Sequence, residues 1–252
     1  MYTLKKSLGQ HFLKDENICK KIVQVLQQKE FEQLLEIGPG AGALTKYLLQ
    51  LPNIEFKAVE LDEEKVTFLL HSFPGIKNKI ISHDFLQMEK PFEGKFTVIG
   101  NFPYNISSQI LFKVLDWKEE VQCMIGMFQK EVAQRIVAKS GSKVYGILSV
   151  LVQIYFEASY LFEVSESCFN PPPKVKSAVI KIIPRENKIG IKSEEALRRL
   201  VKCAFNQRRK MLRNAVKDLF LAEDLEMDIF NKRAEQLSIH DFAALTFLMA
   251  EK

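Results

Sequence analysis

QLLEIGPGAGA, residues 33–43, is the stretch that decides the fold. An apolar run of strand length, 33–37, leads into a glycine-rich turn, and an apolar helical pattern follows at 44–50. Glycines let a ligand approach the backbone closely at the carboxyl end of a strand, where open α/β sheets bind ligands. The stretch therefore predicts a strand, a nucleotide-binding turn containing Gly38 and Gly40, and a helix.

Apolar strand patterns alternate with helical patterns on both sides of this stretch, which is typical of a Rossmann-like α/β fold with a mostly parallel sheet. The last two predicted strands are separated by a proline-rich loop, 168–174, so we expect them to pair as an antiparallel hairpin at a sheet edge. The seven predicted strands are 33–37, 55–60, 79–82, 96–100, 121–128, 155–162 and 177–183; the helices are 44–50, 63–71, 108–115, 130–139 and 146–154.

The pattern becomes entirely helical after a polar linker at 184–190. Ser193, followed by Glu194 and Glu195, is a plausible helix cap. A chain of 252 residues has room for one large domain and a small one. We therefore predict an α/β domain over 1–190 and a small all-α domain over 191–252.

Composition favours a cytoplasmic protein without a membrane segment. The start of the chain has no apolar stretch of signal-peptide length, and Ser149 and Gln153 interrupt the most apolar run. The four cysteines are far apart and the four histidines share no metal-ligand spacing, so we predict reduced thiols and no metal. Nothing in the sequence specifies an oligomer, and a monomer is expected.

The basic residues are unevenly distributed. Eight of the 36 fall between Arg198 and Lys217, where there is no acidic residue; the rest of the chain has 28 basic and 31 acidic residues. Such a run is either a solvated helix face or a patch that contacts phosphates, and the absence of acids favours RNA contact. The predicted RNA-binding residues are Arg208, Arg209, Lys210 and Arg213.

The second and third predicted strands also end in residues suited to a nucleoside cofactor. Glu60 ends the second strand, where a carboxylate can accept hydrogen bonds from ribose hydroxyls, and Asp84 with Phe85 follows the third, suited to an adenine ring. Asp84 as a simple turn cap is the alternative. Gly38, Gly40 and Ala43 also satisfy G-x-G-x-x-A, so an NAD enzyme remains possible at this step.

The fourth strand ends in N-F-P-Y, 101–104, and this motif favours methyl transfer over hydride transfer. Adenine's amino group is a poor nucleophile, but the side-chain carbonyl of Asn101 and the backbone carbonyl of Pro103 can accept its two N–H groups. Tyr104 would stack on an extruded base, with Phe169 as a second wall. Alternatively these aromatics are core residues. In-line methyl transfer from a sulfonium requires positioning, and we predict no general base.

Together these motifs resemble the KsgA-type ribosomal RNA adenine N6-dimethyltransferases of the small subunit, over nearly the whole chain. The resemblance is carried by SLGQHFL at 7–13, EIGPGAG at 36–42, VELD at 59–62, the Asp84 position, NFPYNIS at 101–107, FNPPPKV at 169–175 and AFNQRRKMLRN at 204–214. Phe102 stands where the family usually has leucine, and Lys176 where it usually has aspartate.

The resemblance implies a class I methyltransferase fold with S-adenosylmethionine as cofactor, bound by His11, Leu13, Gly38, Glu60, Asp84 and Asn101. It also implies dimethylation of two adjacent adenosines in the loop of the 3′-terminal hairpin of 16S rRNA, within a pre-30S subunit during ribosome biogenesis. Related large-subunit methyltransferases and a non-catalytic RNA-binding factor are the alternatives.

Overall fold

The computed structural model describes residues 11–250, whose contacts group them into two compact units. The first unit contains residues 11–133 and 159–184, and the second contains 134–158 and the described residues from 185 onward. The Ser7–Gln10 part of the N-terminal motif lies outside the described residues.

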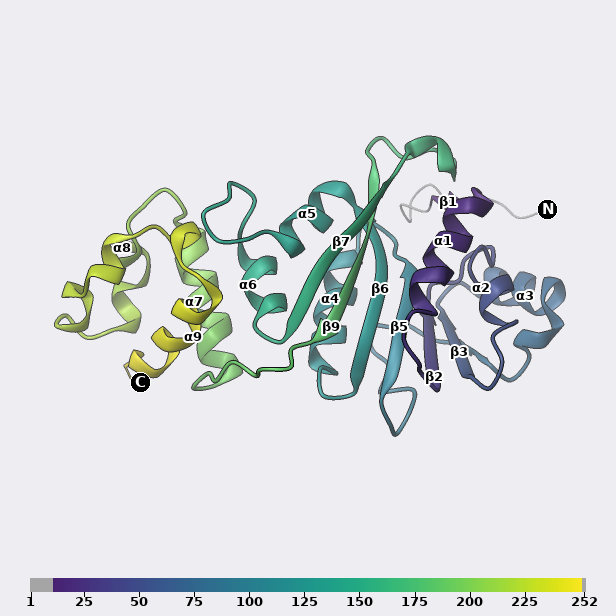
Figure 1. Cartoon of the computed structure of the whole chain (residues 1–252), viewed down its shortest axis with the longest axis horizontal. Coiled ribbons are helices and arrows are strands. Elements are labelled where there is room, and N and C mark those ends of the chain that lie inside the picture. The colour runs from purple at the N-terminus through teal and green to yellow at the C-terminus, as the bar shows by residue number, and fades with distance from the viewer. Residues whose placement is uncertain (1–10, 251–252) are drawn as a thin grey trace. The chain divides into compact units, whose positions relative to one another are not determined.

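A seven-stranded sheet forms the centre of the first unit, in the order β4-β3-β2-β5-β6-β9-β7 (Figure 1). β2 is parallel to β3 and β5, β3 to β4, and β5 to β6, whereas β9 is antiparallel to β6. The predicted mostly parallel sheet is confirmed. Its strands are β2 (Gln33–Ile37), β3 (Glu55–Glu60), β4 (Ile80–Ser82), β5 (Phe96–Asn101), β6 (Val121–Gln129), β7 (Phe156–Val164) and β9 (Ser177–Pro184).

Each predicted strand is present, with ends displaced by at most two residues. β9 lies between β6 and β7, and β7 occupies the sheet edge, so the predicted pairing of the last two strands is confirmed. The chain runs outward from β2 through β3 to β4 and then returns to place β5 beside β2. Ligands of open α/β sheets bind at such a switch point.

Both faces of the sheet are covered. Leu34 and Leu35 are neighbours in β2, point to opposite faces, and are both completely buried. The Leu34 face packs with residues of α1 (Glu16–Leu26), α2 (Thr45–Leu48) and α3 (Glu63–Ser72) in one core cluster. The other helices of this region are α4 (Ser107–Asp116) and α5 (Lys130–Val137).

One helix and two short strands of the first unit were not predicted. Helix α1 begins after Asp15, whose side chain accepts hydrogen bonds from the N–H groups of Asn17 and Ile18. Strand β1 (Phe12–Leu13) pairs antiparallel with β8 (Phe169–Asn170), so that Leu13 faces Phe169. This pairing connects the N-terminal segment to the proline-rich loop, which was predicted to have no strand.

The second unit contains α6 (Ile147–Gln153), α7 (Glu194–Asn206), α8 (Leu212–Val216) and α9 (Ile239–Leu248), with several 3-10 turns. Gln153 Nε2 donates to the carbonyls of Ile136 and Ala138, each at 2.8 Å, and Phe205 packs between the rings of Tyr145 and Phe242. The helices predicted beyond residue 190 are present, but residues 134–158, expected within the first domain, pack with them.

Between residues 11 and 250, no helix is long and apolar enough to cross a membrane. The same residues contain no group of three or more His, Cys, Asp and Glu side chains placed to hold a metal ion. All four cysteines are free thiols.

Candidate active site

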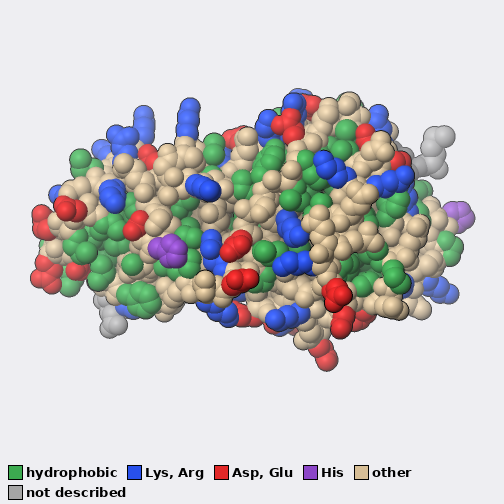
Figure 2. All heavy atoms as spheres, viewed as in Figure 1, with side chains coloured by type: hydrophobic (Ala, Val, Ile, Leu, Met, Phe, Trp, Pro, Cys, Tyr) green, Lys and Arg blue, Asp and Glu red, His purple; other side chains and the backbone are tan. Residues whose placement is uncertain are grey.

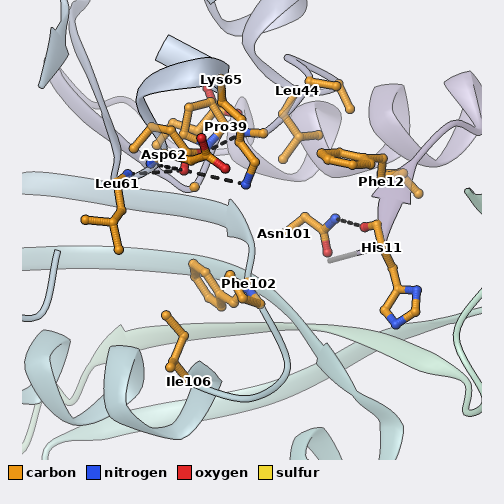
Figure 3. Close-up of a pocket in the computed structure, with 18 of the residues that line it drawn as sticks. His11, Phe12, Pro39, Leu44, Leu61, Asp62, Lys65, Asn101, Phe102 and Ile106 are labelled. Atoms are coloured by element: carbon orange, nitrogen blue, oxygen red, sulfur yellow. Dashed lines mark hydrogen bonds and ion pairs between the residues drawn. The ribbon is translucent and has the colours of Figure 1, made fainter. Parts of the chain in front are cut away.

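A cavity of about 590 Å³ lies where β2, β3 and β5 end, with the N-terminal segment beside it (Figure 3). The strand ends contribute Glu36, Gly38 and Gly40 from β2, Glu60 from β3, and Asn101 through Ile106 from β5. His11, Phe12 and Leu13 complete this wall. The cavity is therefore at the switch point of the sheet, where the sequence predicts the ligand.

The glycine turn adopts a backbone conformation that is unfavourable for residues with a side chain. Gly38 and Gly40 have φ angles of +66° and +58°, in the left-handed region. A Cβ on Gly40 would lie 3.1 Å from the Phe12 ring, so the turn also accepts the close approach of β1. The Gly40 N–H donates to Glu60 Oε2 at 3.2 Å, which connects the turn to the end of β3.

Glu60 is a buried carboxylate whose two oxygens have different numbers of hydrogen-bond partners. Its Oε1 accepts from the N–H groups of Leu61 and Asp62, both at 3.1 Å, and lies 3.6 Å from Lys65 Nζ (Figure 3). Its Oε2 accepts from Gly40. Because a carboxylate oxygen has two lone pairs, Oε2 retains a site for a ribose hydroxyl, as expected for a nucleoside ligand.

Lys65 is a cavity residue that sequence reasoning missed. It is the third residue of α3, is 4% exposed, and has its ammonium 5.8 Å above the centre of the Phe12 ring. A buried ammonium requires a counter-charge, which Glu60 supplies. Its position five residues after Glu60 gave no signal, since a lysine in a charged segment usually faces solvent.

Glu36 is a second buried carboxyl group in the cavity wall that was not predicted. Thr45 Oγ1 donates to its Oε2 at 2.7 Å. Burial raises the pKa of Glu36 to about 8, and the negative charge of Glu60 acts in the same direction, while the Thr45 hydrogen bond opposes it. Glu36 is therefore mainly protonated at neutral pH.

Asn101 ends β5 with its side chain held in one orientation. Its Nδ2 donates to the backbone carbonyl of His11 at 3.1 Å, and the opposite oxygen is turned away from His11 (Figure 3). The amide therefore offers its carbonyl oxygen as an acceptor in the cavity. This is the orientation that the predicted chemistry of an amino group requires.

Pro103 and Tyr104 also line the cavity, but both have intramolecular contacts. The Pro103 carbonyl accepts from the Ile106 N–H at 3.2 Å, which leaves one lone pair for a substrate. The Tyr104 hydroxyl is hydrogen-bonded to Ser177, and burial raises its pKa. The Tyr104 ring lies 5.4 Å from the His11 ring, and His11 Nδ1 donates to the Pro171 carbonyl at 2.8 Å.

Three predicted site residues do not line this cavity. Asp84 accepts from the Leu86 N–H at 2.9 Å and from Gln87 Nε2 at 3.1 Å, so it caps the turn after β4. Phe85 is 5% exposed and packs edge-to-face on Trp117. Phe169 is 1% exposed and belongs to the core. The positions of Asp84 and Phe169 match the alternatives considered from the sequence, whereas no alternative was considered for Phe85.

Of the four predicted RNA-binding side chains, two form hydrogen bonds within the protein and two are exposed to solvent. Arg208 Nη2 donates to the Lys143 carbonyl at 2.5 Å, and Arg213 donates to the side chain of Asn231. Arg209 and Lys210 are exposed. Two of the four side chains therefore hold the second unit together, and two face solvent.

The two positions that depart from the family pattern have structural explanations. Phe102 is buried and packs on Phe128, with ring centres 5.2 Å apart, in space left by glycines. Lys176 forms an ion pair with Glu163, which also pairs with Lys130. Lys176 thus joins the start of β9 to β7.

A switch-point cavity with a glycine turn and an acidic strand end also suits a dinucleotide, but the NFPY motif at the end of β5 and the antiparallel β9 between β6 and β7 are those of a class I S-adenosylmethionine-dependent methyltransferase. Two solved structures share the fold. A dimethyladenosine transferase from Plasmodium falciparum is 26% identical with a TM-score of 0.80, covering 95% of this chain and 99% of that one. The 23S rRNA methyltransferase ErmE is 22% identical with a TM-score of 0.70, covering 92% and 99%.

The family model described as ribosomal RNA adenine dimethylase matches residues 1–251, and the chain belongs to this family. Two relatives, from Flavobacterium johnsoniae and Parabacteroides distasonis, are both named ribosomal RNA small subunit methyltransferase A. The first is 52% identical over 96% of this chain and 94% of its own length, and the second 51% identical over 97% and 93%.

Proposed function

We propose that this enzyme uses S-adenosylmethionine to dimethylate N6 of two adjacent adenosines in the loop of the 3′-terminal hairpin of 16S rRNA, within a pre-30S subunit. The names of the relatives support the small subunit as target. The observation that carries the chemistry is the orientation of Asn101, which offers an amide oxygen at the end of β5. Localisation in the cytoplasm and action as a monomer form part of this proposal.

The cavity residues fit the cofactor. The volume of about 590 Å³ lies within the range of small-molecule sites. Glu60 Oε2 has a free lone pair for a ribose hydroxyl, and the left-handed glycines leave the turn open to close approach. His11 and Leu13 lie in the wall beside them. S-adenosylmethionine bound here supplies a methyl group on a positively charged sulfur.

The chain's own residues would position the target amine. Asn101 Oδ1 and the remaining lone pair of the Pro103 carbonyl each accept one N–H of the adenine amino group. These hydrogen bonds fix the nitrogen and direct its lone pair toward the methyl group, so catalysis comes from orientation and electrostatics. Tyr104 stacks on the extruded base. The proton leaves to solvent, and no side chain needs to act as a base.

Asp84, Phe85 and Phe169 can bind ligands as proposed only if their local backbone moves on binding. Asp84 and Phe85 would contact the cofactor's adenine, and Phe169 the target base, after the turns that contain them shift from the contacts described above. Residues 191–252 would bind the rRNA, with Arg209 and Lys210 in contact with it and with Arg208 and Arg213 holding this surface in place through the contacts described above.

The test is methylation of small subunits that lack these methyl groups, with labelled S-adenosylmethionine and analysis of the digested nucleosides. We expect N6,N6-dimethyladenosine in small-subunit rRNA. Asn101→Ala should reduce the rate about 100-fold or more, by the magnitude typical of one lost electrostatic contact to the reacting group. Asn187→Ala, an exposed asparagine, should match the unsubstituted enzyme. Label confined to large-subunit rRNA would contradict the proposal.

A further inference from the structure

Two segments of the second unit that are far apart in sequence are held together. The loop between α5 and α6, residues 138–146, is bound at two points: the Gly141 N–H donates to the Glu235 carbonyl at 2.6 Å, and Arg208 Nη2 donates to the Lys143 carbonyl at 2.5 Å. Arg208 belongs to the turn between α7 and α8, residues 207–211. The two segments therefore form one continuous surface.

This surface is strongly basic. Lys139 and Lys143 are exposed on the loop, Arg209 and Lys210 are exposed on the turn, and neither segment contains an acidic residue. Two acids lie nearby: Asp241, whose charge acts on the buried Tyr145, and Glu235, whose carboxylate lies 4.0 Å from the Arg208 guanidinium, which offsets that charge. Lys and Arg side chains project from the edge of the second unit where these segments lie (Figure 2).

We propose that residues 138–146 and 207–211 form a two-segment surface that binds the phosphate backbone of ribosomal RNA, with Lys139 and Lys143 as contacts beyond the basic run of α7 and α8. Four exposed cations on two backbone segments match a polyanion, which carries a charge at every nucleotide. Arg208 is a positioning residue here, because its guanidinium holds the loop against the turn. The proposal rests on the rRNA substrate of the proposed function.

The first test is the double variant Lys139→Gln/Lys143→Gln, which removes two charges and keeps the side chains polar. We expect an increase of about tenfold in KM for small subunits, with kcat and the KM for S-adenosylmethionine unchanged. The plot of log affinity for protein-free small-subunit rRNA against log salt should become shallower by about 1.4 to 1.8, the loss of two phosphate contacts. The control, Lys77→Gln/Lys95→Gln, removes two equally exposed charges before β4 and β5, away from the strand ends that form the cavity. Its KM should not change.

The second test examines Arg208 by a double-mutant cycle. Arg208→Met alone should raise KM, because the loop is released. Added to Lys139→Gln/Lys143→Gln, it should have little further effect, because a loop without its lysines has no contact to lose. Fully additive losses would show that Arg208 acts independently of the loop and would contradict the positioning role. Thermal unfolding of each variant verifies that it is folded.

The outcomes separate this inference from the proposed function. An enzyme that does not methylate small subunits at all would contradict the proposed function. Normal methylation with unchanged KM and salt slope in Lys139→Gln/Lys143→Gln would overturn this surface alone. A raised KM for subunits with unchanged affinity for protein-free rRNA would also overturn it, since the partner would then be an acidic ribosomal protein.

Discussion

At the scale of single residues, the site depends on a buried charge pair. Lys65 and Glu60 are 4% and 6% exposed, and the pair fixes the carboxylate that has one lone pair free for the cofactor. The ion pair occupies Oε1 together with two backbone N–H groups, so it directs Oε2 toward the cavity. We therefore expect Lys65 to affect cofactor binding through Glu60.

Lys65→Met tests this arrangement because methionine fills similar space without the charge. We expect affinity for S-adenosylmethionine, measured by calorimetry, to fall about tenfold, or ~1.4 kcal/mol. The urea concentration at half-unfolding should also fall, because Glu60 loses its buried counter-charge. Lys77→Met removes an exposed lysine as the control. Unaltered affinity in Lys65→Met would show that the backbone alone orients Glu60.

Glu36 predicts how stability depends on pH. Its pKa is raised from 4.5 to about 8, so between those values the folded protein retains a proton that the unfolded chain has released. The free energy of unfolding therefore falls as pH rises through this window. Glu36→Gln should show a smaller decrease in Tm between about pH 5 and pH 8 than the unsubstituted protein. Parallel Tm curves for the two proteins would contradict the assigned burial.

At the scale of elements, β5 and β6 approach each other around one aromatic ring. Gly100 pairs with Gly126, and a Cβ on either would lie 2.6 Å and 2.4 Å from the Phe102 ring. The ring therefore occupies space that two glycines provide, immediately after Asn101. This packing explains how phenylalanine is accommodated where the family usually has leucine.

Gly126→Ala should destabilise the protein by about 1–3 kcal/mol, the usual cost of overpacking a core. Phe102→Leu alone should lower the free energy of unfolding by about 1 kcal/mol, but it also removes the ring that the Gly126→Ala methyl group would strike. The double variant should therefore lose less stability than the sum of the two single variants. Urea unfolding with unchanged m values is the measurement. A Cβ on Gly126 would also lie 2.7 Å from the Phe128 ring, so additive losses would show that this second clash dominates.

The predictable elements are those with a local pattern. Buried parallel strands are continuous apolar runs, so β2, β3 and β5 follow from the sequence, as do the cavity residues at their ends. β1 and β8 are two-residue strands that pair across more than 150 residues, and no local pattern identifies them. The contacts of Asp84, Phe85 and Phe169 could not be predicted either, because long-range packing decides where an aromatic ring or a turn carboxylate points. Helix α1 was missed although its Asp15 cap and apolar spacing were present.

At the scale of the whole molecule, the charge distribution separates two tasks. The strand-end cavity holds a buried acid–lysine pair, whereas the exposed cations of the proposed RNA surface, Lys139, Lys143, Arg209 and Lys210, lie on the second unit. Residues 134–158 pack with the C-terminal helices, as the Tyr145 ring does against Phe205 of α7, a contact that the sequence boundary at 190 did not anticipate. Substitutions on the second unit should therefore affect RNA binding without affecting cofactor binding.

Arg209→Ala/Lys210→Ala tests this separation with two exposed cations that have no structural role in the contacts described. We expect weaker binding to small-subunit rRNA and a salt slope shallower by about 1.4 to 1.8, with affinity for S-adenosylmethionine unchanged. Arg208→Ala should also lower thermal stability, because its guanidinium binds the Lys143 carbonyl. An unaltered salt slope in the double variant would exclude this patch from the RNA interface.

The most direct measurement of the central claim is mass spectrometry of nucleosides from small-subunit rRNA. Cells lacking the gene would be compared with cells that carry the unsubstituted gene or Asn101→Ala. The account predicts N6,N6-dimethyladenosine with the unsubstituted gene and its loss both in the deletion and with Asn101→Ala, at equal protein levels. Dimethyladenosine that persists in the deletion, or is fully restored by Asn101→Ala, would contradict it.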